Sequence, residues 1–533
     1  MGGDLFASFI AGGTAAAGLL PSSPVDERDW EEAARRAARR RLAPGLLDEL
    51  RRQSGALPPS PARDRALDAL GRDGVAVVVT GQQVGLFLGP LYTLHKAATA
   101  VARARWISDV TGNPCVPLFW IQTEDHDWEE IRRAEVLGPA GRVSFELPPE
   151  PAALSRVSLA QRVLPPEVDG LATALGQVVA PLPHGSEVSA LVARHYRSGR
   201  TPGAAFAGLL AELFAEEGLL ILDPRTPAMG QLAAPILRRA IEDHEAIARA
   251  LADRARELAA RGFAEQVHTR PGASLAFFHP RGPAGPRYRL VREGAGFSTP
   301  DGPVSLAELL ARLDADPLWF STSALLRPLV QDALLPTAAY LGGPAECSYF
   351  AQLPPVYERF GLVLPMIAPR ARLRLVDGPA RRRLARLGLS PEDVDRPRAE
   401  LLARVAARSG EMPSAEGLRE RLLGGLTREL DALAPLLAGL DPALERNIRR
   451  TRQTATFAVD RLVSATERAA LSKDQVAVER LDRLLDALRP GGRPQERVDA
   501  FPALAARAGP GLLVAALVEA ARSLSPDVRS VNL

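Results

Sequence analysis

The sequence has only two cysteines, Cys115 and Cys347, in a chain of 533 residues. A disulfide framework and a CxxC zinc pair are therefore excluded, and the composition fits a reducing compartment. The N-terminus carries Asp4 where a signal peptide has basic residues, and Gly and Thr interrupt its apolar run before Leu20. This pattern is typical of neither a signal peptide nor a membrane span. We therefore expect a cytoplasmic protein without a membrane partner.

A large excess of charge of either sign is also missing. The chain has 66 basic and 63 acidic residues, a net charge of +3, and acidic and basic residues occur together within segments such as residues 31–41. Nucleic-acid binders usually carry a basic patch or stripe, whereas mixed runs usually solvate helix faces. We therefore expect no nucleic-acid partner.

Apolar residues are plentiful, at 46% of the chain. A chain this long and this apolar exceeds the size of a single core and predicts several packed units. The expected regions are a helical N-terminal segment, a core with two insertions, and a helical C-terminal domain. Their limits are 1–70 for the first, 71–377 for the core with insertions near 136–203 and 262–315, and 378–533 for the last.

The core region shows the pattern of an α/β fold. Residues 75–79 and 116–121 are short apolar runs typical of buried parallel strands. A glycine-rich stretch and an alanine-rich helical pattern over residues 91–107 lie between them, which makes a βαβ unit,. The fold class predicted is a Rossmann-type parallel sheet. Two more runs are predicted as strands of this sheet, residues 219–223 and 338–341.

The C-terminal region predicts an antiparallel helical hairpin. Its second helix has apolar or small residues at alternating steps of four and three, the signature of a coiled-coil seam. Such an arm either joins two chains into a homodimer or packs within one chain, and the pattern leaves both open. The seam is Leu444, Ile448, Thr451, Ala455, Ala458, Leu462, Ala465 and Ala469, and its partner seam is Leu426, Leu430, Leu433, Leu437 and Leu440.

Polar residues are dense after the first predicted strand, where ligands bind in open α/β sheets. Glycines permit close approach, and the amides of a helix N-terminus attract anions. The spacing GxxxGxxxG differs from the GxGxxG fingerprint, and no P-loop occurs, so a nicotinamide cofactor is disfavoured. The candidate binding residues are Thr80, Gln82, Gln83, Gly85, Gly89, Tyr92 and Lys96, with His95 beside them.

An acidic cluster follows the second predicted strand. Glu124, Asp125, His126 and Asp127 are consecutive, and such charges are costly to bury without partners,. The simpler interpretation is a solvated loop that caps the next helix. The functional interpretation is that Asp125 or Asp127 orients His126 for acid–base chemistry or binds a substrate amine. The cluster matches no standard metal-ligand spacing, so whether a metal binds is left open.

A third cluster surrounds the last predicted strand. Arg327 can bind a carboxylate or phosphate through two hydrogen bonds, or form a surface ion pair. Glu346 can recognise an amine or hydroxyls, or cap a helix. Cys347 has no histidine near it in sequence, which favours a buried small residue over a nucleophile. The remaining candidates for binding here are Ser321, Gly342 and Gly343.

Four ordered motifs carry a resemblance to a known family. They are TGQQVGLFLGPLYTLHKA, FWIQTEDHDWEEI, FSTSALLRP and YLGGPAECSYFAQL. With these motifs the chain resembles the bacillithiol-biosynthesis cysteine ligase family, BshC, from about Val75 to Asp377, followed by a coiled-coil arm as in the family. The fourth position of GGPAEC departs from the family pattern, where Ala345 replaces an expected glycine.

The resemblance implies a fold similar to the core of class I aminoacyl-tRNA synthetases, with a coiled coil that supports homodimers. GPLYTLHK is similar to a degenerate HIGH signature, in which His95 corresponds to the second histidine. The cysteine ligands that hold zinc in cysteine-activating synthetases have no counterpart here. The implied reaction adds L-cysteine to the amine of glucosaminyl-malate, with ATP or another adenine nucleotide activating the cysteine carboxylate.

The implied roles divide among the three clusters. Gln82, Gln83, Gly85, Gly89 and Lys96 would hold phosphate; Asp125, His126 and Asp127 would bind an amine or act as base; and Arg327 would hold the malate carboxylates. Two other functions stay open. One is a nucleotidyl transferase that adenylylates a small metabolite, and the other is a non-catalytic nucleotide- or tRNA-binding protein with a synthetase-like core.

Overall fold

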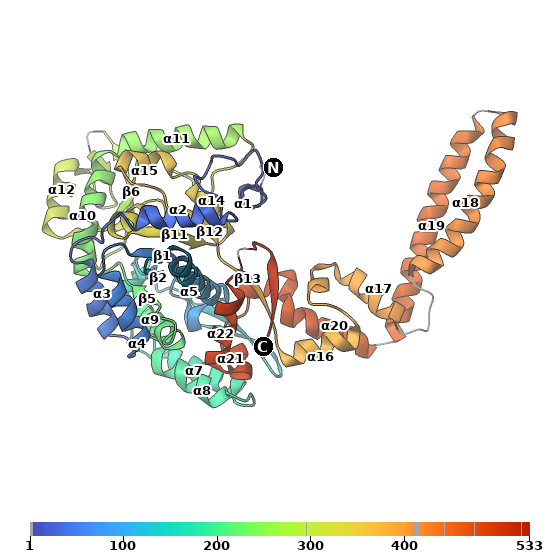
Figure 1. Cartoon of the computed structure of the whole chain (residues 1–533), viewed down its shortest axis with the longest axis horizontal. Helices are drawn as coiled ribbons and strands as arrows, with labels where there is room; N and C mark the ends of the chain where they lie inside the picture. The colour runs from blue at the N-terminus through green and yellow to red at the C-terminus, as the bar shows by residue number, and fades with distance from the viewer. Residues whose placement is uncertain (1–3, 295, 409–414, 442, 474, 524) are drawn as a thin grey trace. The chain divides into compact units, whose positions relative to one another are not determined.

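A computed structural model describes residues 4–294, 296–408, 415–441, 443–473, 475–523 and 525–533. The chain divides into two compact units, the first of Met1–Leu373 and Glu496–Val531 and the second of Arg374–Gln495 and Asn532–Leu533 (Figure 1). This division differs from the regions expected from the sequence. Residues 1–70 belong to the first unit together with the core, and the chain returns to that unit after residue 495.

The first unit is built on five parallel strands in the order β12-β11-β1-β2-β5. The predicted α/β class with a Rossmann-type parallel sheet is confirmed. Four of these strands coincide with runs predicted from the sequence, and β12 was not predicted. The strands are β1 (Ala76–Gln82), β2 (Cys115–Ile121), β5 (Leu220–Leu222), β11 (Thr337–Gly342) and β12 (Met366–Pro369).

Side chains of β1 alternate between two layers of the core, as expected for a strand buried on both faces. Val77 and Val79 pack with leucines of α3 and α4. Ala76 and Val78 pack with Trp30 of α2 and with alanines of α5. The N-terminal segment therefore covers both faces of the sheet. The helices are α1 (Leu5–Ile10), α2 (Glu27–Ala37), α3 (Leu46–Gly55), α4 (Pro61–Leu70) and α5 (Tyr92–Thr111).

A β-hairpin and several helices form the first insertion and the segments before and after it, from α6 to α11. A proline-rich insertion was predicted near residues 136–203, and the structure has a β-hairpin followed by helices there. The elements are α6 (Trp128–Ile131), β3 (Arg133–Gly138), β4 (Gly141–Glu146), α7 (Glu167–Val179), α8 (Gly185–His195), α9 (Pro202–Leu213), α10 (Pro227–Glu242) and α11 (His244–Ala260).

The second insertion is an antiparallel sheet in the order β10-β6-β7-β8-β9. It extends past the predicted limit at residue 315, because β10 pairs with β6. The elements are β6 (Ala273–Phe278), β7 (Tyr288–Glu293), β8 (Gly296–Ser298), β9 (Val304–Ser305), α12 (Leu306–Ala315) and β10 (Phe320–Thr322). The rest of this unit adds α13 (Arg327–Leu334), α14 (Pro344–Phe350), α15 (Pro354–Phe360), α21 (Pro502–Ala508) and α22 (Pro510–Ala520).

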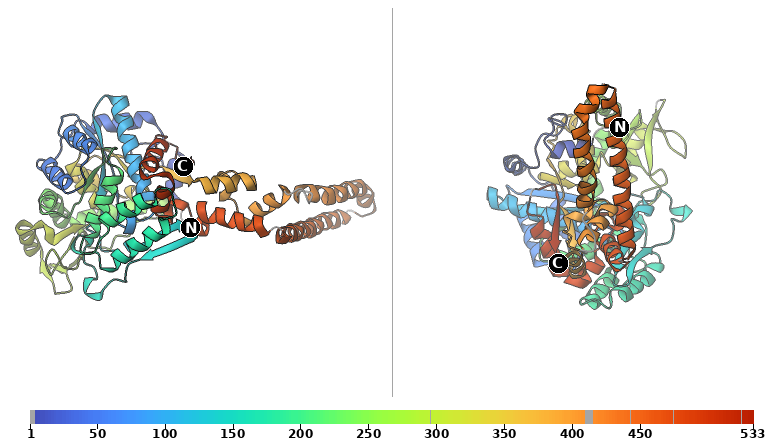
Figure 2. Two further views of the ribbon diagram at one scale, coloured as in Figure 1. Left: turned by 90° about the horizontal axis from the view of Figure 1, so that it is seen from below. Right: turned by 90° about the vertical axis from the view of Figure 1, so that its right-hand side faces the viewer.

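The second unit contains the predicted antiparallel hairpin, formed by α18 and α19, which lie side by side in both views (Figures 1 and 2). Arg419 of α18 pairs with Asp460 of α19 at 2.8 Å. The remaining bounds of the chain are β13 (Arg372–Val376), α16 (Gly378–Leu387), α17 (Arg398–Arg408), α18 (Ala415–Leu440), α19 (Leu444–Lys473), α20 (Gln475–Leu488) and β14 (Val528–Asn532).

The predicted heptad seam holds only in part. Ile448 is buried and Leu444 and Ala455 are half-buried, but Leu462 is 54% exposed while its neighbour Val463 is buried. A straight helix drifts relative to a seven-residue repeat, which moves the shielded stripe from Leu462 to Val463. Three further seam positions, Thr451, Ala458 and Ala465, are exposed, and the side chain of Ala469 lies outside the described residues.

Among the described residues, no single helix has the length and apolar character needed to cross a membrane. The bent pair α21 and α22 passes that test only when its two helices are taken together.

Trp30 anchors α2 to the central sheet. Its indole Nε1 donates to the carbonyl of Pro24 at 2.9 Å, and its ring is 1% exposed. We expect Trp30→Ala to lower the free energy of unfolding by about 3–5 kcal/mol, because a large buried ring leaves a cavity. Trp106, the half-buried edge-to-face partner of Trp30, provides the control. Urea unfolding should show a smaller loss for Trp106→Ala, and equal losses would contradict this anchoring role.

Candidate active site

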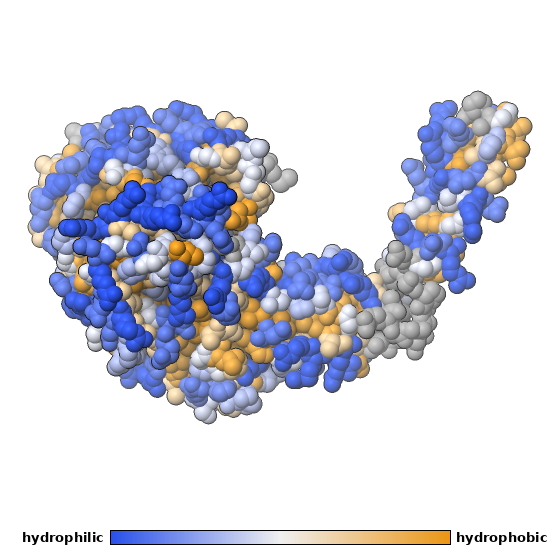
Figure 3. Space-filling model, viewed as in Figure 1, coloured by the Kyte–Doolittle hydropathy of each residue, from blue (hydrophilic) through white to orange (hydrophobic). Residues whose placement is uncertain are grey.

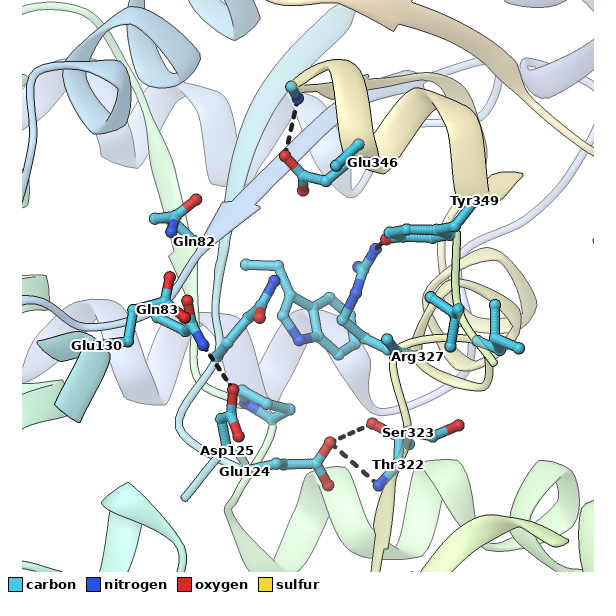
Figure 4. Close-up of a pocket in the computed structure, with 18 of the residues that line it drawn as sticks. Gln82, Gln83, Glu124, Asp125, Glu130, Thr322, Ser323, Arg327, Glu346 and Tyr349 are labelled. Carbon is cyan, nitrogen blue, oxygen red and sulfur yellow. Dashed lines mark hydrogen bonds between the residues drawn. The ribbon is translucent and has the colours of Figure 1, made fainter. Parts of the chain in front are cut away.

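A cavity of about 540 Å³ opens in the first unit beyond the carboxyl ends of β1, β2 and β11. Figure 4 shows Gln83, Glu130 and Asp125 on one side, and Arg327 with Tyr349 on the other. This is the edge at which open α/β sheets bind ligands. Ten candidate residues named from the sequence line it: Gln82, Gln83, Tyr92, Lys96, Glu124, Asp125, His126, Arg327, Gly343 and Glu346.

The acidic loop after β2 presents two carboxylates in contrasting surroundings. Asp125 accepts hydrogen bonds from Gln83 Nε2 and from the His126 amide, both at 2.7 Å. Burial alone would raise the pKa of Asp125, but His126, Arg287 and Gln83 together hold it well below its ordinary value. Glu124 accepts from Thr322, and burial raises its pKa above the ordinary value. Asp125 is therefore the permanent anion of the pair, and Glu124 is the better proton acceptor.

Lys96 and Glu346 form a buried ion pair on the opposite side of the sheet end. Their Nζ and Oε2 atoms are 2.5 Å apart. Lys96 also donates to the Gly81 carbonyl at 2.7 Å and to Gln82 Oε1 at 2.8 Å. Burial alone would raise the pKa of Glu346, but Lys96, the Gly343 amide and the Tyr340 hydroxyl lower it. Both charges are therefore neutralised within the site, and Lys96 is already occupied by three acceptors.

The glycines expected to hold phosphate form a turn outside the cavity. A Cβ on Gly85 would lie 3.0 Å from the Gly89 Cα, so these residues allow two stretches of backbone to touch. The turn has φ values of 50° at Phe87, 69° at Leu88 and 65° at Gly89. Of the phosphate cradle predicted from Gln82, Gln83, Gly85, Gly89 and Lys96, the two glutamines and the lysine line the cavity, and the two glycines lie outside it.

His95 points away from the cavity. It is fully buried, and its Nδ1 lies 3.1 Å from Glu496 Oε2. Glu496 also receives two hydrogen bonds from Arg370, at 2.6 and 2.7 Å, and Arg370 lines the cavity. Burial lowers the pKa of His95, which keeps its ring neutral. His95, expected to be catalytic, therefore lies behind Arg370 and does not line the cavity. Its neighbour Lys96 does line the cavity wall.

Four other candidates lie outside the cavity wall, three of them held by hydrogen bonds and one by close packing. Thr80 donates to the Leu341 carbonyl at 2.8 Å, which links β1 to β11. Asp127 caps α6 by accepting from the Glu130 amide at 3.0 Å. Ser321 is fully buried against His279 Nε2 at 3.1 Å. Gly342 is packed under α14, where a Cβ would meet Glu346 at 2.8 Å.

Sequence reasoning missed four arginines that line the cavity. Arg289 lies on β7 in the second insertion and Arg287 directly precedes that strand, while Arg370 follows β12 and Arg497 lies in the returning segment. Arg287 donates to the Thr322 carbonyl at 2.9 Å and to the Glu124 carbonyl, so it fixes the acidic loop against β10. The signal in the sequence that could have found two of them is the spacing of Arg287 and Arg289, because residues two apart in an extended segment lie on the same face,.

Cys347 is fully buried and contributes no exposed thiol to the cavity. Burial raises the pKa of its thiol, as it does for Cys115. In the described part of the chain, no group of three or more His, Cys, Asp or Glu side chains is arranged to hold a metal ion.

Comparison with known proteins assigns the chain to a family. Residues 3–371 match the family described as "Bacillithiol biosynthesis BshC, N-terminal Rossmann-like domain". Residues 373–529 match "Bacillithiol biosynthesis BshC, C-terminal coiled-coil domain". The chain belongs to the BshC family. The coiled-coil match continues into the segment after residue 495, which in space joins the unit that contains the cavity.

Similar proteins of the BshC family cover most of the chain. A relative from Solibacter usitatus is 36% identical over 85% of this chain and 82% of its own length. One from Koribacter versatilis is 34% identical over 91% and 88%, and one from Geobacillus thermodenitrificans is 29% identical over 85% and 84%. Each of these relatives is named "Putative cysteine ligase BshC".

Tyr196 holds the glycine turn in place. Its hydroxyl accepts from the Leu88 amide at 3.0 Å and donates to the Gly85 carbonyl at 2.6 Å. Tyr196→Phe leaves both buried backbone groups without a partner, so we expect a loss of about 2–4 kcal/mol in the free energy of unfolding. Denaturant titration measures this, with Tyr288→Phe as the control. A change below about 0.5 kcal/mol would show that the turn is held by other contacts.

Both cysteines should resist alkylation in the folded protein. Burial and a raised thiol pKa reduce access and thiolate formation at Cys115 and Cys347,. We expect mass spectrometry to find no iodoacetamide adduct after brief treatment at neutral pH, and two adducts after unfolding in urea. Rapid native labelling of Cys347 would restore it as a candidate nucleophile.

Proposed function

We propose that this chain is a cysteine ligase that joins the carboxylate of L-cysteine to the amine of glucosaminyl-malate, the last step of bacillithiol synthesis. The supporting observation is the charge arrangement of the cavity. An acidic loop lies on one side, and arginines without a carboxylate partner among the described residues, such as Arg327, lie on the other. Both substrates carry an amine and at least one carboxylate, and they match this arrangement.

The two carboxylates of the acidic loop have different roles toward the attacking amine: one binds it and the other accepts its proton. Asp125 stays ionised and binds the ammonium form of the acceptor, assisted by the half-buried ring of His126 beside it. An amine attacks only when neutral, so a proton must leave before or during formation of the C–N bond. Glu124, with its raised pKa, accepts that proton more readily than Asp125,.

Amide formation also requires an activated acyl group, because a free carboxylate does not condense with an amine in water. We propose ATP or another adenine nucleotide as the activating substrate. Arg327 is suited to bind the anionic group that is activated, because it is 5% exposed and, among the described residues, its guanidinium donates only to the neutral groups Gln331 at 2.8 Å and Tyr349 at 3.4 Å. Lys96 fits that task less well because Glu346 already neutralises it.

The proposal includes a homodimer formed through the α18–α19 hairpin. Large apolar side chains remain uncovered there, with Phe457 66%, Leu436 69% and Leu440 79% exposed. Figure 3 shows apolar surface along this hairpin among charged residues. A helix face of this kind is typical of a surface that packs against a second chain.

Asp125→Asn tests the proposed role of the acidic loop. We expect kcat/KM for amide formation to fall by the equivalent of about 2–5 kcal/mol, because the variant removes a charge paired with the substrate ammonium. Asp127→Asn provides the matched control, because Asn caps a helix as well as Asp and Asp127 lies outside the cavity wall,. Mass spectrometry of purified protein with L-cysteine, glucosaminyl-malate and ATP measures the product.

Three results would contradict this proposal. Unchanged ligation in Asp125→Asn would remove the acidic loop from the mechanism. Pyrophosphate release without an amide product would favour a nucleotidyl transferase. Nucleotide binding without any turnover, or an RNA affinity that falls steeply with salt, would favour a binding protein.

A further inference from the structure

Arg289 is a cationic side chain of the cavity that the proposed roles leave unused. It is half-buried and lies on β7, in the second insertion. Among the described residues its guanidinium makes no hydrogen bond and no ion pair, and it lies 5.4 Å from the ring centre of Phe277. Burying a cation without a counter-ion is costly, so this position favours an anionic ligand.

The neighbours of Arg289 form a continuous wall of the cavity. Phe277 of β6 pairs directly with Arg289 across the two strands, so both side chains lie on one face of the sheet,. Arg287 directly precedes β7, and its guanidinium lies 4.0 Å from the Phe277 ring centre. Both guanidinium groups therefore lie close to the same aromatic ring.

Positive charge accumulates along this wall. Arg287 is buried, and its Nε has no hydrogen-bond partner in the part of the chain that the structure describes. Burial, and then the nearby charge of Arg270, lower the pKa of Arg289. An anion bound at Arg289 would relieve both effects, since it would supply the counter-charge that the surrounding protein lacks.

The wall is connected to the acidic loop at one end. Arg287 holds the carbonyl of Glu124, next to the carboxylates proposed to receive the acceptor amine. Arg289 follows Arg287 by two residues, and residues two apart in an extended chain are separated by about 6.6 Å, roughly the length of one pyranose ring. An amino sugar with its amine at the acidic loop can therefore extend its substituent to Arg289.

We infer that Arg289 is the specificity-determining residue that binds a carboxylate on the substituent of the amino-sugar acceptor. This inference rests on the proposed function, because it assigns the acceptor's acidic group to the inserted sheet. The sequence had suggested Arg327 for the malate carboxylates. With Arg289 in this role, Arg327 serves the group being activated, and the two anions occupy separate cations.

Binding measurements with the full-length chain test this inference. Isothermal titration calorimetry compares glucosaminyl-malate with methyl glucosaminide, which has the same amino sugar but a neutral substituent. We expect Arg289→Gln to weaken binding of glucosaminyl-malate about 10- to 100-fold, the loss typical of a charge-assisted hydrogen bond. Binding of methyl glucosaminide and of L-cysteine should change less than twofold. Arg289→Lys should recover part of the lost affinity.

Arg292→Gln is the matched control. Arg292 lies on the same strand but outside the cavity wall, where it packs over Phe297. It should bind both acceptors as the unmodified protein does, and thermal unfolding should show all three variants folded. Unchanged glucosaminyl-malate binding in Arg289→Gln, or equal weakening for both acceptors, would overturn the inference.

The binding measurements, combined with the mass-spectrometric assay of amide formation, separate this inference from the proposed function. If the unmodified chain binds glucosaminyl-malate through Arg289 but forms no amide, the ligase proposal fails and the specificity assignment stands. If it forms the amide and Arg289→Gln retains full preference for the acidic acceptor, the assignment fails alone. No binding of glucosaminyl-malate to the unmodified chain would overturn both.

Discussion

The pairing of Lys96 with Glu346 is the constraint on which the cavity depends. An ammonium this deeply buried must be matched by acceptors, because the cost of leaving it unpaired exceeds most single contributions to stability. Its three acceptors come from the end of β1 and from α14. The start of α5, which carries Lys96, is thereby tied to both neighbouring parts of the sheet edge. The amide of Gly343 is also satisfied by Glu346.

This pairing decides where ligand charge can be accommodated. Because Lys96 is neutralised, the available positive charge comes from arginines on other elements, and the available negative charge comes from the loop after β2. Environment then separates the two acids of that loop: Glu124 has a raised pKa and Asp125 a lowered one. One sheet edge can therefore bind an amine and accept its proton with two adjacent carboxylates.

The predictable part of the structure is the part that depends on short-range pattern. Apolar runs identified four of the five central strands, and the acidic loop was expected at the cavity for the same reason, since it directly follows a buried strand. The helical hairpin was also expected. The residues that its buried face contains were not all predicted, because a heptad pattern and a straight helix diverge over several turns. Val463 is therefore buried in place of Leu462,.

The sequence by itself determined the α/β class, the strand ends and the polar clusters that follow them, because hydrophobic periodicity and chain order are local properties. It could not determine which members of a cluster face the ligand. His95 and Lys96 are adjacent, yet one is held by Glu496 and the other lines the cavity. Arg289 reaches the same cavity from an insertion. Only the tertiary structure decides these positions, because Glu496 and Glu346, which hold His95 and Lys96, lie far away in the chain, and the strand of Arg289 belongs to a distant insertion.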